Sequence, residues 1–577
     1  MFLGLVAIYY LFRFDYWERD IIIRSDGYAY YGYVQGTLVH HDPLNTFHGE
    51  LEGKDRNRSW MHEGLPGKYL PKMTMAIAYA WTPGFFLADL AASLLDYPQD
   101  GWSRPYQLAV GFSAVLFLLI GLWATWHVLR RRFSDTISSA VVMVIYLVTN
   151  LLQYGSVDAS MSHVYSFALI ACFMLVSDRW VERRSLSHLL AAAFLLGWIV
   201  LIRPTNIIVG LYLPFMLWQR DGNIRSLLSW QILYAAGAAF LPILPQLIFW
   251  KLAAGEWVHY SYEQEAFYWM SPHIWEGLFS YRNGWLVYTP VMWLALLGLA
   301  FYSRIEKRLA LGLGVVTLLH IYITFSWWCW YYGGSLSIRP MIDIYPILAL
   351  GMAAMFSFIW RRGMVPTLIA AVVVLSLGWN NILQVKYSNL GVIHDSAMTK
   401  EAFWATFMTP KQPGHLSMAG YYRDPDTDHL RLGLPERLEY DTAYSQMVGK
   451  IEYQRIGMDQ VRRFTNMLKV NASELPLNVD SLIQITCEVK MNDVDANELI
   501  AIVAFKKGEE TYQYQGADLG KILNDAGVRK TVKLFVRKPR NLPEGTHMEC
   551  YYWLKGKGSA EAYSMEITPI KVTRRPL

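Results

Sequence analysis

The chain of 577 residues is 54% hydrophobic and only 17% charged, whereas soluble domains carry about 25% charged residues. With 23 Trp and 37 Tyr, this composition excludes an ordinary soluble protein and favours one for which lipid is the solvent. The formal net charge of +5 is small, and no stripe of Lys and Arg alternates with aromatic residues, so nucleic-acid binding is not expected.

Apolar runs of about 20 residues, the length that a membrane helix needs, recur up to about residue 385 and then stop. We therefore expect a polytopic α-helical membrane protein with about 11 spans. The first apolar run lacks a basic n-region and a small-residue cleavage site, so it is interpreted as a membrane helix rather than a signal peptide. The expected spans are 1–14, 105–129, 136–154, 160–177, 187–202, 205–219, 228–250, 285–302, 309–327, 341–360 and 364–384.

Arginine clusters fall in every second connection between these expected spans. By the positive-inside rule these connections are cytoplasmic, which also places the N-terminus in the cytoplasm. The alternate connections, beginning with the long first outer loop 15–104, then lie outside, and we expect a bacterial inner-membrane protein. The basic clusters are Arg130 to Arg132, Arg179 to Arg184, Arg220 to Arg225, Arg304 to Arg308 and Arg361-Arg362.

Two segments do not read as simple spans. The run Lys72–Leu95 is apolar but is interrupted by Pro83-Gly84 and an acid, which is typical of a helix lying along the membrane interface. The short segments 187–202 and 205–219 meet at Arg203-Pro204, so they are candidates for a hairpin that does not fully cross.

Past residue 388 the composition becomes that of a soluble domain. We therefore divide the chain into a transmembrane domain, 1–388, and a mainly-β extracytoplasmic domain, 389–577. Five segments alternate apolar and polar residues and are rich in Val, Ile, Tyr and Thr, which predicts a small antiparallel β-sandwich. Cys487 and Cys550 lie in two of them and either form a disulfide or fill the core. The predicted strands are Ser481–Lys490, Glu498–Lys506, Thr531–Arg537, His547–Leu554 and Tyr563–Val572.

An acidic residue, Asp26, follows the first apolar run, where a helix should be leaving the bilayer. A carboxylate at that depth is costly unless it has a partner or lines a wet cavity, which makes it a functional candidate. Asp26 is our candidate catalytic base; the alternatives are a helix cap or an ion pair with Arg24. Gly27 would let a substrate approach the backbone. Tyr28 and Tyr31 either stack on a sugar or anchor the interface.

Cations in the other outer connections are candidate ligands of a phosphate. Arg203 lies in an apolar hairpin, where an unpaired guanidinium would cost roughly 2.5–3.5 kcal/mol or more, so it must meet a phosphate or a buried carboxylate. Arg282 with Asn283, and Arg339, open later helices at the outer face. A guanidinium binds phosphate bidentately, although arginines at helix ends also reach toward lipid headgroups. His163 either contacts a substrate or is a packed histidine.

The segment Trp327–Gly334 contains clustered tryptophans and a double glycine. Trp330 is the candidate for an aromatic wall against a sugar. An interfacial belt would also explain the tryptophans, but it does not explain Gly333 and Gly334, which suit a turn that a ligand approaches closely.

Outside the membrane there are no nucleotides, so a transferase there needs a donor carried by a lipid. A polyprenyl-phosphate sugar already has a good leaving group, and the protein must supply cations for the developing charge and one carboxylate to deprotonate the acceptor. The lone acid and the outer-end arginines fit these needs.

At these motifs the chain resembles the integral-membrane glycosyltransferases of the C-type fold, and in particular bacterial relatives of the dolichyl-phosphate-mannose–protein mannosyltransferases and the lipid A aminoarabinose transferase. The resemblance covers about the first 385 residues and implies Asp26 as inverting base, with Arg203, Arg282 and Arg339 as phosphate ligands. The chain has Asp-Gly where the protein mannosyltransferases have Asp-Glu, so neither a protein acceptor nor a metal follows; Mg or Mn stays open. The motifs are Ser25–Tyr31, Ser162-His163, Leu201–Asn206, Tyr281–Gly284 and Trp330–Arg339.

The sequence thus predicts an enzyme that moves a hexose or pentose from a polyprenyl phosphate to a lipid- or glycan-linked acceptor in the periplasm. The alternatives are a flippase for lipid-linked sugars and a non-catalytic scaffold of a surface-assembly complex, with envelope proteins as partners of the C-terminal domain. A transporter should show acids or broken helices near the middle of the bilayer in paired halves, whereas here the ionisable groups gather at the outer ends.

Overall fold

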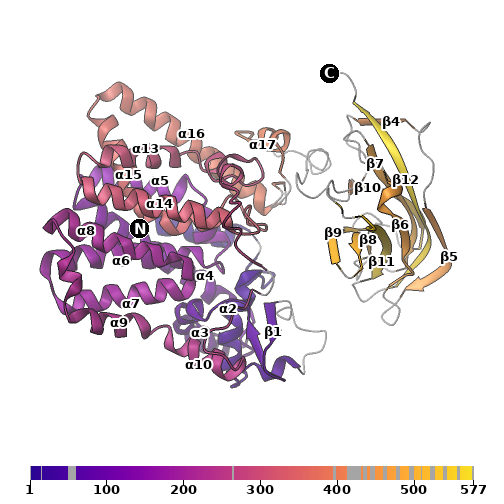
Figure 1. Ribbon diagram of the computed structural model, residues 1–577, viewed down its shortest axis with the longest axis horizontal. Helices are drawn as coiled ribbons and strands as arrows, with labels where there is room; N and C mark the ends of the chain where they lie inside the picture. The colour runs from indigo at the N-terminus through magenta and orange to yellow at the C-terminus, as the bar shows by residue number, and fades with distance from the viewer. Residues whose placement is uncertain are drawn as a thin grey trace. The chain divides into compact units, whose positions relative to one another are not determined.

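The computed structural model divides into two compact units, which are described separately: Met1–Ser396 with Thr406–Gln412, and Ala397–Ala405 with Pro413–Leu577 (Figure 1). The residues that the structure describes are 2–14, 16–49, 60–262, 265–390, 392–393, 398–411, 431–432, 438–441, 449–458, 464–475, 481–492, 499–508, 510–519, 527–536, 542, 544–554 and 559–574.

The first unit is a bundle of helices, joined by one small β-hairpin in the first outer loop (Figure 1). Its α-helices are α1 (Phe2–Arg13), α2 (Asp26–Val34), α3 (Ala76–Leu94), α4 (Arg104–Arg130), α5 (Asp135–Leu147), α6 (His163–Arg183), α7 (Leu186–Ile202), α8 (Tyr212–Asp221), α9 (Gln231–Phe240), α10 (Leu244–Ala253), α11 (Ile274–Phe279), α12 (Trp285–Tyr288), α13 (Met292–Tyr302), α14 (Lys307–Ser326), α15 (Tyr345–Trp360) and α16 (Met364–Asn389). All of α17 (Lys400–Thr406) except Thr406 belongs to the second unit. The 3-10 and π segments are η1 (Gln35–Val39), η2 (Thr46–Gly49), η4 (Gln153–Val157), η5 (Pro204–Leu211), η6 (Arg225–Leu228) and η7 (Arg339–Ile344), and the hairpin is β1 (Met61–Glu63) with β2 (Tyr69–Pro71).

Among the described residues, five helices are long and apolar enough to cross a membrane, and the bent pair α9–α10 would make a sixth. The five are α4, α6, α14, the continuous helix formed by η7 and α15, and α16. Four further apolar helices, α1, α5, α7 and α13, are shorter. The predicted count of about 11 spans is therefore not confirmed, although every predicted range contains helix.

Proline explains several of the differences between the predicted spans and the helices. Pro290 separates α12 from α13 within the predicted span 285–302, and Pro242 with Pro245 accompanies the 48° bend between α9 and α10. Proline lacks the N–H that continues a helix and its ring clashes with the preceding turn. The break at Arg203-Pro204 falls where the sequence predicted it. α3 contains Pro83, and its place along the interface stays a prediction.

Four of the basic turns lie together at the end of the bundle opposite the first outer loop. Arg132, just after α4, is paired with Asp178 of α6 at 2.7 Å and with Glu306, just before α14, at 2.9 Å. Arg184 is paired with Asp221 of α8. Asp178 has no exposed surface, so its charge requires these partners. We call this the basic end of the bundle.

The second unit is strand-rich. Its described strands form a six-stranded and a four-stranded sheet, and all of the strand pairs are antiparallel. The first sheet has the order β3–β10–β7–β12–β4 with β5 also on β12, and the second has the order β6–β11–β8–β9. The strands are β3 (Arg431–Leu432), β4 (Leu438–Asp441), β5 (Gly449–Met458), β6 (Leu468–Asn471), β7 (Ser481–Met491), β8 (Leu499–Lys507), β9 (Glu510–Asp518), β10 (Arg529–Val536), β11 (His547–Leu554) and β12 (Ala560–Arg574), with η9 (Ala472–Glu474) after β6.

One hydrophobic cluster takes side chains from both sheets. In β11 the alternate residues Met548, Cys550, Tyr552 and Leu554 are fully buried in it, as period-two patterning requires. Cys487 of β7 is buried in the same cluster, and it is not bonded to Cys550. The structure therefore assigns both thiols to core filling, while the predicted sandwich arrangement stays a prediction.

Candidate active site

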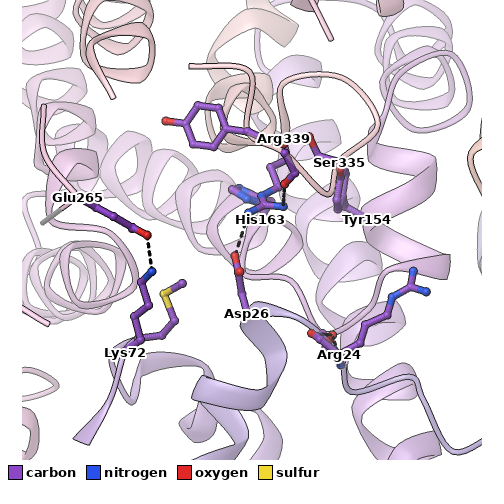
Figure 2. A network of polar contacts seen from close by, with 12 residues as sticks. Arg24, Asp26, Lys72, Tyr154, His163, Glu265, Ser335 and Arg339 are labelled. Atoms are coloured by element: carbon purple, nitrogen blue, oxygen red, sulfur yellow. Dashed lines mark hydrogen bonds and ion pairs between the residues drawn. The ribbon is translucent and has the colours of Figure 1, made fainter. Parts of the chain in front are cut away.

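Asp26 begins α2, directly after Ser25, whose φ of 49° turns the chain sharply. Its carboxylate accepts a hydrogen bond from the guanidinium of Arg339 at 3.0 Å, and the two side chains are only 13% and 11% exposed (Figure 2). The alternative pairing with Arg24 is therefore wrong: the partner of Asp26 is Arg339, which lies 313 positions later in the chain.

Gly27 does not open the backbone to a substrate, contrary to the sequence interpretation. A Cβ at this position would collide with the side chain of Ser160, in the turn before α6. Glycine is needed here because α2 packs directly against that turn, which fixes the position of Asp26.

Arg339 begins η7, and within the described part of the chain its one hydrogen bond besides that to Asp26 is a long one. One Nη lies 3.5 Å from the carbonyl oxygen of Gly333, and its Nε is buried without a hydrogen bond. Buried N–H groups of a guanidinium are normally satisfied. Arg339 therefore keeps donor capacity beyond its ion pair with Asp26.

Arg203 is the residue between α7 and η5, and its backbone is extended. Within the described ranges its side chain makes neither a hydrogen bond nor an ion pair within 4 Å, and its electrostatic partners are Asp343 and the hydroxyls of Tyr332, Tyr30 and Tyr262. Tyr30 and Tyr262 also interact electrostatically with Asp26. The same two tyrosines thus interact electrostatically with both the carboxylate of Asp26 and the guanidinium of Arg203.

His163 is a packed histidine. Its Nδ1 lies 3.0 Å from the carboxylate of Asp343, which has no exposed surface, and Asn206 donates to the other oxygen at 2.8 Å. The sequence analysis did not identify Asp343. Its only signal is an acid four residues after Arg339, inside an otherwise apolar run.

Arg24 does not face Asp26. Its Nε binds the carboxylate of Asp158 at 3.0 Å and its guanidinium lies 3.9 Å from the ring centre of Tyr16, so its charge and its flat face are both occupied. Arg24 and Asp158 join the first outer loop to the turn before α6, which makes Arg24 a residue that holds these loops together.

Lys72 is a second residue that the sequence analysis missed. It follows β2 and is paired with Glu265 at 2.6 Å, while its ammonium lies 5.5 Å from the ring centre of Tyr262 (Figure 2). Because Tyr262 also interacts with Asp26 and Arg203, Lys72 belongs to the same polar region. Nothing in its local sequence distinguishes this lysine from a surface lysine.

The predicted Arg282 and Asn283 brace the loop that carries Arg339. The guanidinium of Arg282 stacks 3.4 Å from the ring centre of Tyr331 and 5.8 Å from that of Trp330, and Asn283 donates to the carbonyl oxygen of Tyr331 at 3.1 Å. Both residues are almost fully buried. Their observed contacts are with the loop, and a direct contact with phosphate stays a prediction.

The remaining aromatic and glycine candidates have separate roles. Tyr31 is buried and donates to the carbonyl oxygen of Gly101, so it is a packing residue rather than a sugar ligand. Tyr28 is partly exposed and stacks on Trp102. Gly334 has a φ of 72° and faces open space, which fits a turn that a ligand can approach.

No protein-family model matches the chain, and no curated protein matches it. Solved structures do match. ArnT from Cupriavidus metallidurans in the apo state is 13% identical, with 58% of this chain and 65% of that chain covered and a TM-score of 0.36. The apo oligosaccharyltransferase of Archaeoglobus fulgidus is 12% identical, with 75% and 60% covered and a TM-score of 0.42.

The arabinosyltransferase EmbB from Mycobacterium smegmatis is also 12% identical, with 99% of this chain and 64% of that chain covered and a TM-score of 0.34. These structural neighbours are C-type-fold glycosyltransferases. The class is the one that the sequence motifs resemble. In each case the match covers less than two thirds of the solved chain, and at these identities the likeness concerns the fold alone.

Proposed function

We propose that this protein is a membrane-embedded, inverting glycosyltransferase that moves a sugar from a polyprenyl phosphate to a lipid- or glycan-linked acceptor on the periplasmic side. One observation carries the proposal: the carboxylate of Asp26 is held by Arg339, while Arg203 interacts electrostatically with two tyrosines that also interact with Asp26, and makes no hydrogen bond in the described chain. A base paired with one guanidinium, with a second guanidinium in the same polar region, is the set of charges that this transfer needs.

The reaction would run as a single displacement at the anomeric carbon. Asp26 takes the proton of the acceptor hydroxyl, the acceptor oxygen forms a bond to the anomeric carbon, and the bond from that carbon to the phosphate oxygen breaks. The electron pair leaves on the polyprenyl phosphate, whose extra negative charge Arg203 and Arg339 stabilise. Attack from the face opposite the leaving group inverts the configuration.

The ion pair at Asp26 gives the sequence of events a physical order. While Arg339 binds the carboxylate, one lone pair that should accept the acceptor proton is engaged. A donor phosphate competes for the same guanidinium, and Arg339 has an unsatisfied Nε to offer it. Donor binding therefore frees Asp26 to act as a base, and the acceptor is deprotonated only when a sugar is present.

A divalent cation, Mg or Mn, stays a prediction, and the steps above are written without one. The described residues contain no group of three or more His, Cys, Asp or Glu side chains that could hold a metal. Asp26, Asp158 and Asp343 are instead bound to guanidinium, imidazole or amide groups. Each step above is assigned to side chains of the protein.

The test uses the full chain in lipid nanodiscs and a donor identified by mass spectrometry of co-purified polyprenyl lipids. Asp26→Asn should lower transfer by about 100-fold to 10,000-fold, because the general base is lost, while donor binding persists. Asp20→Asn is the matched control, since Asp20 lies in the same outer loop and is 41% exposed; it should keep near-wild-type activity. Arg203→Gln should weaken donor binding about tenfold or more.

Transfer that persists in Asp26→Asn at the wild-type rate would refute the assignment of the base. Loss of transfer in the Asp20→Asn control as well would show that the loop, rather than the carboxylate of Asp26, is what matters. A scaffold protein would keep its role in all three variants, and a flippase would move lipid-linked sugar without forming a new glycosidic bond.

A further inference from the structure

A long apolar groove lies on the side of the bundle formed by α1, α5, α15 and α16. Its volume is about 980 Å³, and no charged residue occurs among the described residues that line it. Tyr9 of α1, Met143 of α5, Phe356 of α15 and Val374 and Trp379 of α16 are representative of its walls. It contains none of the residues of the candidate active site.

The groove exists because only a small part of the surface of α16 packs against the rest of the bundle. Only 28% of the apolar window of α16 is buried, whereas 78% is buried in the neighbouring span formed by η7 and α15. Figure 1 shows α16 along one edge of the helical unit. Water that filled a groove of this size between apolar spans would lose hydrogen bonds, because the walls of the groove offer almost no hydrogen-bonding groups. The apolar matter available at this depth is the hydrocarbon of lipid.

One mouth of the groove carries two arginines. Arg361 and Arg362 form the turn between α15 and α16, directly after Trp360 and shortly before Thr367, both of which line the groove. Both arginines are exposed, and no ion pair is recorded for either within the described residues; Arg362 stacks over the ring of Phe358 at 4.7 Å.

The acid beside the opposite wall, Asp135, does not cancel this charge. Asp135 begins α5 beside the lining residue Thr136, and it is paired with Arg130 at 3.3 Å. The mouth therefore has a net positive charge. α15 starts from η7, which carries Arg339, so this mouth lies at the basic end of the bundle. The positive-inside rule assigns that end to the cytoplasmic leaflet, which contains anionic lipid.

We propose that this groove binds an anionic phospholipid of the leaflet at the basic end, with its phosphate at Arg361 and Arg362 and its acyl chains along α16. Basic pockets between membrane helices on the cytoplasmic side bind such headgroups. The lipid completes the packing of α16 against α1 and α5. The proposal is independent of the proposed glycosyltransferase activity, since the groove shares no residue with the candidate active site.

The experiment measures lipid retained by the full chain in nanodiscs of phosphatidylethanolamine with a minor fraction of phosphatidylglycerol. After transfer to mild detergent, native mass spectrometry counts the lipids that remain bound, and lipid extraction identifies them. The wild type should retain phosphatidylglycerol. The double variant Arg361→Gln, Arg362→Gln should bind it roughly 25-fold more weakly, since each arginine near the surface contributes about a factor of five.

Two matched controls separate the groove from the general charge of this end. The double variant Arg220→Gln, Arg225→Gln removes the same charge from exposed positions at the end of α8 and just after it and should retain the lipid. Ala370→Phe fills the groove and should expel the acyl chains, whereas Val372→Phe, on a face of α16 outside the groove and 63% exposed, should not. Size-exclusion profiles confirm that the variants fold.

Equal retention by the Arg361/Arg362 and Arg220/Arg225 variants would overturn the proposal, as would retention of phosphatidylethanolamine alone. Unchanged retention in Ala370→Phe would place the lipid elsewhere on the protein. A polypeptide found in the groove in place of lipid would likewise refute it.

Discussion

The ion pair between Asp26 and Arg339 joins the two side chains on which the proposed chemistry depends. Both are largely buried and lie 3.0 Å apart, so removing one of them leaves a charge that is poorly solvated. Such a loss typically costs about 3–5 kcal/mol, much more than the net contribution of the pair itself. Stability therefore provides a test of this contact that does not depend on activity.

We expect Asp26→Asn and Arg339→Gln to destabilise the protein individually and to compensate one another in the double variant. The coupling free energy should be about 1–3 kcal/mol, measured as the shift in thermal unfolding of the full chain in nanodiscs. The matched control is Asp20 with Arg104, a more exposed pair at 3.8 Å, for which coupling below about 1 kcal/mol is expected. Additive effects at Asp26 and Arg339 would mean that the two charges do not form a pair in the membrane.

Individual residues were predicted from the sequence with uneven success, for a physical reason. Asp26, Arg203 and Arg339 could be selected because a charge at the membrane edge needs an explanation wherever it lies in the fold. Their partners could not be selected, since pairing depends on which loops meet in space. Asp158 and Glu265 therefore went unnoticed although they bind Arg24 and Lys72, and Gly27 was assigned to a substrate when it faces Ser160.

At the scale of single elements, the strands were predicted more closely than the helices. The predicted strand His547–Leu554 is identical to β11, because alternation with a buried face fixes both ends. Strand β9 (Glu510–Asp518) was missed, since its polar residues resemble a loop and it lies at the edge of its sheet. Hydropathy located the apolar helices, but a hydropathy average does not register the helix-breaking effect of proline. The range 285–302 was therefore predicted as one span, although Pro290 interrupts it.

Strand β11 also carries a carboxylate, that of Glu549, whose contribution to stability depends on pH. Glu549 is 5% exposed and lies within 3.2 Å of Lys469, His547 and Lys506. Burial would raise the pKa of Glu549, but hydrogen bonds from these three residues outweigh burial and lower the pKa from 4.5 to about 2. Stabilisation from this carboxylate is therefore complete above its unfolded pKa of 4.5 and is lost as the pH falls toward 2.

We expect the strands around β11 to lose about 2 kcal/mol of protection between pH 5 and pH 2, after allowance for screening by solvent near the lysines. Hydrogen exchange of the full chain, corrected for the intrinsic pH dependence of exchange, measures this loss. Glu549→Gln should flatten the profile, whereas Glu452→Gln, at a position 69% exposed, should leave it unchanged. A profile that is equally steep in Glu549→Gln would assign the effect to other groups.

On the scale of the whole molecule, the helical unit separates charge between its two ends. Arg132, Arg184 and their partners gather at the basic end, and Asp26 with Arg339 lies at the other. The sequence could predict this separation because loop charge follows membrane topology. The number of spans could not be predicted in the same way, since short and bent helices satisfy hydropathy without showing how far they cross.

We expect the end with Asp26 to face the periplasm. In a background with Cys172 and Cys329 changed to Ser, a cysteine at Pro66, in the hairpin of the first outer loop, should react with a membrane-impermeant maleimide in intact cells. A cysteine at Asn223, at the basic end, should react only after the membrane is opened. Both positions are exposed, so access to solvent is matched. The reverse labelling pattern would invert the topology and rule out a periplasmic acceptor.

The sequence separation of 313 between Asp26 and Arg339 also bears on how the protein is made. The ribosome synthesises Asp26 soon after the first helix. Arg339, which carries the opposite charge, is synthesised only when the helical unit is nearly complete. During translation the nascent chain must therefore hold an uncompensated anion at the edge of the bilayer until the last spans arrive. Chains that terminate before residue 339 would leave that anion without its partner guanidinium.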